Sequence, residues 1–459
     1  MDIKLNFISL LGFFGFCFIA WISSENRKNF PWVLVLVGIV VQFILALLFF
    51  LTPNLFTVVM GTVNDFPIQL YDAADTGSRF LFGILVPDKT VTLPPLLNEL
   101  TGEYDMQKLI NPSTNQIQSN RIAFGYIFAF RSLPQIIFFS AIFALFYRFN
   151  LVQRIVEILS KIFQYRIKLS GREFLSGFMN IFFAVESLII ITPYFKKMTR
   201  SELVTVLTCC FGTASGTVLG IQSGFLRTAL PNVTDHMLLA SIITIPACFV
   251  ISKIIVPEGD GVTYLETQPK SISKKESFLS SLLNGGWDGA RVALGIIIGM
   301  IVVLGLVSLV NMLFSNLSTL QSNDSSIGKF FKLVSLENIL GALFFPLTFL
   351  TGISLNVSEL WTSSVIIGKR LFQTSIPSYI MLGKLGADGQ ISNRAVLILT
   401  YVLCGFAHIP AIGIFIGGLS GLVPKRSNEI CSLAWKALWA ATLATLMSGS
   451  IAGLFYFGA

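Results

Sequence analysis

The amino-acid sequence predicts an all-α polytopic membrane protein with about eight transmembrane helices and two re-entrant helical hairpins arranged as an inverted repeat. The first observation is composition: 54% of the residues are hydrophobic and 12% are charged, with a mean hydropathy of +0.76. An ordinary soluble domain carries about a quarter charged residues. Second, several apolar runs reach the roughly 20 residues that span a hydrocarbon core. Third, two apolar segments, 168–195 and 363–388, are interrupted by polar residues near their middles.

The predicted transmembrane helices are long apolar runs joined by loops. They cover 7–22, 32–51, 124–147, 203–224, 237–256, 291–314, 394–422 and 432–457. The first run follows Lys4 as in a signal peptide, but no A-x-A-type cleavage site comes after it, so we expect a membrane span. The stretch 52–83 is apolar but broken by Pro53 and Pro67, which suits a helix lying in the membrane interface.

The order of these segments divides the chain into four parts. They are the N-terminal spans with an interfacial helix (1–147), a first hairpin unit (148–256), a linker with a scaffold span (257–335), and a second hairpin unit (336–459). Polar linkers are expected at 85–121, 257–284 and 315–329. In each hairpin unit an interrupted segment is followed by two long spans.

Basic residues gather in the short loops and indicate which side of the membrane each loop faces. They are Arg27, Lys28, Arg148, Arg154, Lys161, Arg166, Lys168, Lys196, Lys197, Arg200, Lys274, Lys275, Lys425 and Arg426. Basic loops are typically cytoplasmic. Placing all of them inside puts both termini outside and gives the two hairpin units opposite orientations. The net charge of +8 is thereby explained by membrane topology, and we expect no nucleic-acid partner.

The two interrupted segments carry polar residues at membrane depth. These are Glu173, Asn180 and Glu186 in the first segment, and Lys369, Arg370, Gln373, Thr374 and Ser375 in the second. Irregular backbone survives at that depth only where protein or a water-filled cavity covers it. Interrupted segments in corresponding positions of two halves are typical of a transporter's binding site. We therefore predict a solute transporter.

Neutral oxygens suited to a sodium ion occur at two places. Asn180 offers an amide oxygen, and Ser215 and Thr217 lie in Gly-Thr-Ala-Ser-Gly-Thr (212–217), where Gly216 loosens the helix. Side-chain oxygens and unwound carbonyls together can cage a cation. The alternative is ordinary helix packing, with the hydroxyls bonded to the preceding turn. The residues alone leave both readings open.

Charged residues and histidine in an apolar span are costly and commonly functional. Glu186 has no basic residue within four positions, whereas Glu173 is adjacent to Arg172 and is expected to be either its structural partner or functional. His408 stands two residues before Pro410, which removes a backbone donor and frees the carbonyl of Phe406. We expect the helix to be kinked or unwound there, with a functional role for the histidine.

Small residues predict close helix contacts. Gly295 with Gly299, and Gly413 with Gly417 and Gly421, have the spacing of packed membrane helices. The six cysteines show no CxxC or metal-ligand spacing and are expected to pack in the interior. Nucleophile elbows, phosphate loops and metal-ligand clusters are absent from the sequence, so we expect neither an enzyme nor a cofactor other than a coupling ion, Na+ or H+.

Several motifs resemble the concentrative nucleoside transporter family. They are Arg-Phe-Leu-Phe-Gly (79–83), Phe-Ala-Phe-Arg-Ser-Leu-Pro-Gln-Ile-Ile-Phe-Phe-Ser-Ala (128–141), Met-Thr-Arg-Ser-Glu-Leu (198–203), Gly-Thr-Val-Leu-Gly (216–220), Cys-Gly-Phe-Ala (404–407) and Ile-Gly-Ile-Phe-Ile-Gly-Gly-Leu-Ser-Gly-Leu-Val-Pro-Lys-Arg (412–426). The similarity runs from about residue 30 to the end in the right order. It implies a homotrimer in a bacterial inner membrane, in which two hairpins and their partner helices cradle a nucleoside and a coupling cation.

The resemblance also implies a set of site residues. The cation would be bound by Asn180, Phe183, Ser215 and Thr217, with Na+ at Asn180 and Ser215. The substrate would contact Ala184, Val185, Glu186, Leu219, Ser375, Phe406, His408 and Ala411.

Here, however, the first hairpin reads Asn-Ile-Phe-Phe-Ala-Val-Glu (180–186), one residue shorter than in the family and without its base-reading Gly-Gln-Thr. The family's Asn-Glu is replaced by Thr374-Ser375, and its Asn-Phe-Ser-Ser by 408–411, so ribose contacts are lost.

The expected function is therefore cation-coupled uptake of nucleosides or a nucleoside-like solute. Because a polar ligand group left unpaired lowers affinity, ordinary ribonucleosides are expected to bind weakly. Two alternatives are a symporter of the same fold for a different small solute, and a non-transporting membrane receptor or channel.

Overall fold

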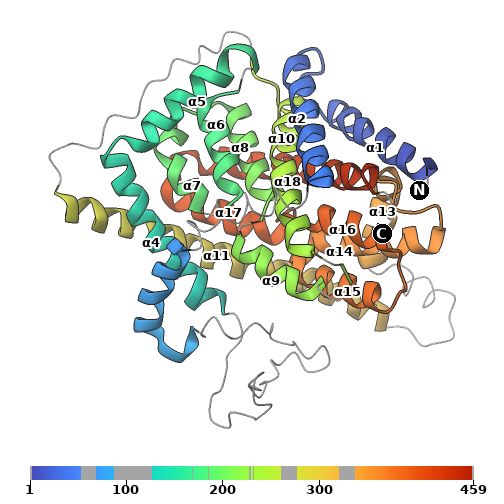
Figure 1. Ribbon diagram of the computed structural model, residues 1–459. Helices are drawn as coiled ribbons and strands as arrows, with labels where there is room; N and C mark the ends of the chain where they lie inside the picture. The colour runs from blue at the N-terminus through green and yellow to red at the C-terminus, as the bar shows by residue number, and fades with distance from the viewer. Residues whose placement is uncertain are drawn as a thin grey trace.

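The computed structural model describes residues 3–52, 69–86, 127–167, 169–183, 186–214, 216–226, 229–230, 232–259, 277–319 and 336–456. All regular secondary structure in these residues is helical, as predicted (Figure 1). The predicted interfacial stretch 52–83 is described only in part, and it is helical over 69–82. Lys274 and Lys275 lie outside the described residues.

Six helices in the described part of the chain are long and apolar enough to cross a membrane. They are α1 (Ile3–Ile22), α2 (Trp32–Leu51), α4 (Phe128–Arg148), α10 (Val233–Ile255), α11 (Phe278–Thr319) and α18 (Ser427–Leu454). In the most apolar stretch of each helix, 83% of the residues of α10 and 89% of those of α18 are buried, against 33% for α2 and 22% for α11. Helices α10 and α18 therefore form the core, and α2 and α11 present apolar faces to the outside.

Two predicted spans, 203–224 and 394–422, are not continuous helices. The first is α8 (Arg200–Gly212) followed by α9 (Gly216–Leu226), and the second is α16 (Asn393–Leu403) followed by α17 (Ile409–Leu422). Glycine at the end of α8 and the start of α9 lowers the helix propensity there. The second break has its own cause, since Pro410 stands in the first turn of α17 and cannot continue a helix from α16.

Helix α11 begins 13 residues before the predicted span 291–314, inside the predicted linker 257–284. Polar residues in its first turns concealed it. The reason for the extension is tertiary, because Gly285 and Gly289 bring this part of α11 against the backbone of α4 at Ser140 and Ile137. Further along, Gly295 and Gly299 lie against Gly417 and Gly413 of α17, where added Cβ atoms would collide with backbone carbonyls. The predicted glycine packing is thus confirmed.

Each interrupted segment is a pair of helices. The first comprises α6 (Gly171–Asn180) and α7 (Glu186–Ile191), which continues into the 3₁₀ turn η2 (Thr192–Lys197). The second comprises α14 (Val357–Phe372) and α15 (Ser375–Ala387). The order of helix pair, broken helix and long helix therefore occurs twice, ending in α10 and in α18. Helices α5 (Leu151–Ile167) and α13 (Leu336–Leu350) precede the two pairs.

Three of the basic loops meet at one end of the helices. Glu25, between α1 and α2, pairs with Arg200 at 3.1 Å and also with Lys436. Arg426, after α17, donates to the carbonyls of Phe195 (2.5 Å) and Met198 (2.8 Å) at the end of the first helix pair.

The two chain ends lie near each other, away from these loops (Figure 1). Arg394, at the start of α16, donates to Asn6 Oδ1 at 2.7 Å and to the Gly352 carbonyl at 2.8 Å. Its guanidinium also lies over the ring of Tyr456.

Candidate functional site

The broken helix α8–α9 contacts both helix pairs, at the last residue of α6 and at the first residue of α15. Asn180, the last residue of α6, is buried against the break between α8 and α9, because its carbonyl accepts from Thr213 Oγ1 at 3.4 Å. Ser375, the first residue of α15, is buried against α9. Both helix pairs thus pack against the broken helix α8–α9, so their irregular backbone is covered by protein, as such backbone must be at membrane depth.

The side chain of Asn180 is held by three neighbours. Its Nδ2 donates to the Ser176 carbonyl at 2.8 Å and contacts Cys210 Sγ at 3.6 Å. Its Oδ1 accepts from Ser187 Oγ of α7 at 3.0 Å. The amide oxygen is thereby turned toward the second helix of the pair. Ser187 and Thr213 were missed by the sequence interpretation, since their hydroxyls look like helix-packing groups.

Neutral oxygens lie around Asn180: the Ser187 hydroxyl contacts its amide oxygen, and the Thr213 hydroxyl lies 3.4 Å from its backbone carbonyl and 2.9 Å from the Cys209 carbonyl. Hard cations prefer such oxygen ligands. No group of three or more His, Cys, Asp or Glu that could hold a transition metal occurs in the described part of the chain. The arrangement fits Na+ better than a transition metal.

The structure describes the other predicted cation residues, Phe183, Ser215 and Thr217, only in part. Phe183 turns its ring away, into an aromatic cluster with Tyr71, Phe139 and Phe143. Ser215 lies outside the described residues, and Thr217 lies in the first turn of α9, where only the backbone is described.

Six of the predicted substrate residues are described, and all six are buried or half-buried; among them, His408 contacts Phe406 and Ala411. Glu186 begins α7 and is buried, and Leu219 is buried on α9. Ala184 and Val185 lie outside the described residues. Ser375 accepts from Gln222 Nε2 at 2.8 Å. Gln222 is fully buried on α9, one turn after Leu219, and it was not identified from the sequence.

His408 caps α17, because its Nδ1 accepts from the backbone N–H of Ala411 at 3.1 Å. That acceptor role assigns the proton to Nε2. The ring is buried and lies edge-on to Phe406, which in turn contacts Phe415. The predicted break before Pro410 is confirmed, but the Phe406 carbonyl is not free, since the N–H of His408 donates to it at 2.7 Å.

The adjacent basic residues Lys369 and Arg370 of the second helix pair have different environments and partners. Arg370 is fully buried and donates to the Val402 carbonyl and to Thr445 Oγ1 at 3.3 Å, while Lys369 pairs with Glu337 near the surface. A guanidinium at the carboxyl end of α16 satisfies a terminal carbonyl and complements the helix dipole. Arg370 thus fixes α14 to α16 and α18.

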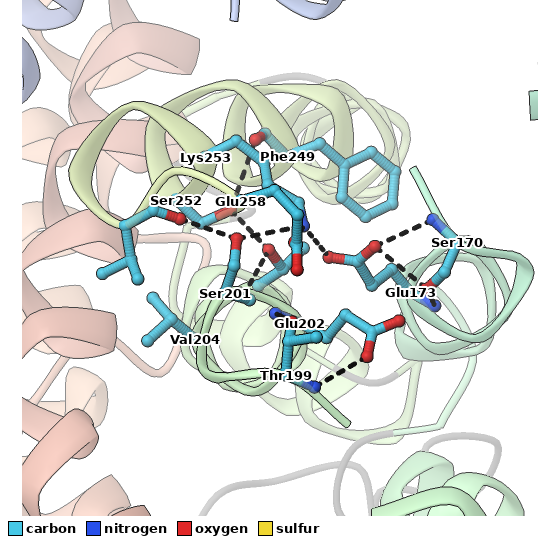
Figure 2. A network of polar contacts seen from close by, with 12 residues as sticks. Ser170, Glu173, Thr199, Ser201, Glu202, Val204, Phe249, Ser252, Lys253 and Glu258 are labelled. Carbon is cyan, nitrogen blue, oxygen red and sulfur yellow. Dashed lines mark hydrogen bonds and ion pairs between the residues drawn. The ribbon is translucent and has the colours of Figure 1, made fainter. Parts of the chain in front are cut away.

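A buried ion network fixes the start of the first helix pair, as Figure 2 shows. Lys253 of α10 lies 2.6 Å from Glu173 Oε1 and 2.8 Å from Glu258 Oε2, and it donates to Ser201 Oγ at 3.1 Å. Glu173 also accepts from Ser170 in a capping box at the start of α6. Of the two alternatives for Glu173, the structural one fits these contacts, but its partner is Lys253 and not Arg172.

Arg172 instead pairs with Glu202 of α8 at 2.7 Å. Glu202 also closes a capping box with Thr199, so both ion pairs lie at helix N-termini. At the exposed edge of the network, burial would raise the pKa of Glu258, but the ammonium of Lys253 outweighs burial and the pKa is lowered. The network therefore joins α6, α8 and α10.

Comparison with known proteins gives three family matches along the chain. Residues 11–85 match "Na+ dependent nucleoside transporter N-terminus", residues 129–229 match "Nucleoside recognition", and residues 236–453 match "Na+ dependent nucleoside transporter C-terminus". An uncharacterized transporter of Haemophilus influenzae is 30% identical over 72% of this chain and 77% of its own length. The nucleoside permease NupC of Helicobacter pylori is 27% identical over 98% of both chains.

Solved structures of CNTnw have the same fold. A doubly substituted CNTnw in an outward-facing state matches with a TM-score of 0.80, 26% identity and coverage of 98% of this chain and 99% of that chain. CNTnw in an inward-facing substrate-bound state matches with a TM-score of 0.65, 25% identity and 98% coverage of both chains. The chain is a multi-pass membrane protein and belongs to the concentrative nucleoside transporter family, a family of Na+-dependent transporters rather than enzymes.

Proposed function

We propose that this protein is a cation-coupled symporter that takes up nucleosides or a nucleoside-like solute across a bacterial inner membrane. One observation carries the proposal: each helix pair meets a broken helix through buried polar groups, at Asn180 with Thr213 and at Ser375 with Gln222. Both contacts involve the same broken helix, α8–α9, so the two helix pairs would build a cation site and a solute site side by side along it.

The coupling ion is proposed to be Na+. The Asn180 amide oxygen and the hydroxyls of Ser187 and Thr213 would hold it, together with Ser215, Thr217 and the backbone carbonyl of Phe183. When the ion binds, Ser187 can rotate its hydroxyl proton away from Asn180 and present a lone pair instead. Proton coupling through the buried Glu186 is the alternative, because a carboxylate can change its charge during a transport cycle.

The solute is proposed to bind among Glu186, Leu219, Ser375, Phe406, His408 and Ala411, beside Ala184 and Val185. The capping bond from Ala411 occupies one nitrogen of His408, which leaves Nε2–H to face a ligand. Each neutral hydrogen bond lost to the solute costs about 0.5–1.5 kcal/mol. Two or three such losses would weaken the binding of ordinary ribonucleosides by roughly fivefold to somewhat over a thousandfold.

The membrane arrangement follows as part of the same proposal. Six continuous helices and two broken ones make eight spans, and the two helix pairs enter and leave the membrane on the side from which they came. The loops that meet at Glu25 would be cytoplasmic and both termini periplasmic, because basic loops face inward. The largely exposed α11 would join three copies in a homotrimer. The TM-score is higher for outward-facing CNTnw than for inward-facing CNTnw, which favours an outward-facing conformation here.

Uptake by purified protein in proteoliposomes tests the proposal. An inward sodium gradient should drive saturable accumulation of at least one member of a panel of nucleosides, deoxynucleosides and nucleobases. Collapse of that gradient with an ionophore should abolish accumulation. Accumulation that persists without sodium but follows a proton gradient would replace Na+ by H+, and no gradient-driven accumulation of any member would refute symport.

A further inference from the structure

The carboxamide of Gln222 is half satisfied. Its Nε2 donates to Ser375 Oγ at 2.8 Å, while its Oε1 is buried and has no hydrogen-bond partner in the part of the chain that the structure describes. The side chain is fully buried. A buried acceptor without a donor costs free energy, and such a group in a native protein calls for a partner from outside the chain.

The helix that Gln222 contacts has no side-chain cap at its N-terminus in the part of the chain that the structure describes. Helix α15 begins at Ser375, and its preceding residue Thr374 makes no side-chain capping bond. The first N–H groups of a helix have no partner within the helix. Because Pro377 has no N–H, the N–H groups of Ser375 and Ile376 are the donors that the first turn of α15 can offer to a ligand. The neighbouring helices α14, α16 and α17 are all capped by side chains.

The two features lie together, because Oε1 and Nε2 of Gln222 share one carbon and Nε2 already touches the first residue of α15. The unpaired acceptor therefore lies close to the positive end of α15. A carboxylate would be repelled by Oε1, and an ammonium would be repelled by the helix terminus. A neutral hydroxyl satisfies both, since it donates its proton to Oε1 and accepts from a backbone N–H.

We propose that Gln222 is a specificity-determining residue, which with the first turn of α15 binds one neutral hydroxyl group of the transported solute. This inference rests on the proposed function and adds the chemistry of one contact. Ser375 acts as the positioning residue: its hydroxyl accepts from Nε2 and so keeps Oε1 turned toward the solute. A sugar hydroxyl of a nucleoside is the class of group that fits.

The test compares uridine with 2′-deoxyuridine, 3′-deoxyuridine and 5′-deoxyuridine by thermal-shift titration of the purified full chain in sodium chloride, up to the solubility of each. The wild type should bind one of the three deoxy analogues about two- to tenfold more weakly than uridine, the value of one neutral hydrogen bond. Gln222→Met removes the carboxamide and keeps its shape. This variant should bind uridine more weakly than the wild type by the same factor, and it should bind the weaker deoxy analogue as the wild type does. Uridine and that analogue should therefore bind the variant equally well.

Gln42→Met is the matched control. Within the described residues, Gln42 is also fully buried with an unpaired Oε1, but it lies on α2 and its Nε2 donates to the Gly38 carbonyl of its own helix, so its substitution should leave the discrimination intact. If Gln222→Met does not fold, Gln222→Glu decides, because it keeps an acceptor and must retain the preference for the hydroxyl.

Three results would overturn the assignment. Equal discrimination in wild type and Gln222→Met, or loss of discrimination in Gln222→Glu, rejects Gln222 but leaves nucleoside binding standing. Equal affinity of the wild type for uridine and all three analogues does the same. No binding of any of the four to the wild type rejects the contact with a sugar hydroxyl, whereas the proposed symport falls only if no solute of the uptake panel accumulates.

Discussion

Substituting Lys253 by methionine should strongly destabilise the protein. The ammonium lies within 2.8 Å of carboxylates of both Glu173 and Glu258, and the three side chains are only 3%, 0% and 10% exposed. Methionine fills a similar volume but leaves both carboxylates without their cation. Breaking a buried ion pair by removing one partner costs about 3–5 kcal/mol. Most of this cost should come from Glu173, whose carboxylate is fully buried, because Glu258 retains some access to water.

The double variant Lys253→Met with Glu173→Gln isolates the cause. Glutamine keeps the reach to cap α6 but carries no charge, so most of the lost stability should return, with a coupling of about 2–3 kcal/mol. Apparent melting temperatures in detergent should rank wild type first, the double variant next and Lys253→Met last. Lys161→Met is the control, because its pair with Glu157 is exposed and contributes about 0–1 kcal/mol. A single variant as stable as wild type, or a double variant no better than the single one, would refute the reasoning.

Three further predictions address the packing, the ion and the pH dependence. Gly299→Leu should lower the melting temperature and abolish uptake, because any side chain there meets the Gly413 backbone, whereas Gly305→Leu, on an open face of α11, should change neither. Asn180→Ala should raise the half-saturating sodium concentration for uptake by about tenfold, or 1.4 kcal/mol; an unchanged sodium dependence would argue for coupling through another group. Burial raises the pKa of Glu25, but Lys436 and Arg200 outweigh burial and lower it. Its contribution to stability is therefore present at neutral pH and lost as pH falls below about 4. Melting curves of wild type and Glu25→Gln should differ at pH 7 and converge at low pH, and a constant difference would contradict this.

The sequence was sufficient for the fold class and for the places where helices break. Membrane spans are recognisable because lipid demands long apolar runs, and polar residues inside such runs are costly enough to mark special sites. The interruption around Asn180 and the proline after His408 therefore predicted helix breaks that the structure contains. The glycine spacing predicted a close contact for the same reason, since only residues without side chains let backbones touch.

Partner choice was decided only by the tertiary structure. Sequence proximity suggested that Glu173 pairs with Arg172, yet Lys253, 80 residues further on, is its partner. A pairing across α6 and α10 depends on how helices pack, and no local pattern contains that information. The same holds for the start of α11, where contact with α4 overrides the polar residues of its first turns.

The candidate site shows the same division most clearly. Asn180 and Ser375 stand out in the sequence because they interrupt apolar segments, whereas Gln222 and Ser187 do not, since single polar residues in a helix are ordinarily packing groups. Their significance arises from which atoms remain unpaired after folding: the Gln222 oxygen has no partner in the described chain, and the Ser187 hydroxyl is turned to Asn180. The sequence by itself determined where polar groups enter the membrane core. Only the packed structure decided which of them are paired with each other and which are left for a ligand, because hydrogen-bond satisfaction depends on neighbours distant in the chain.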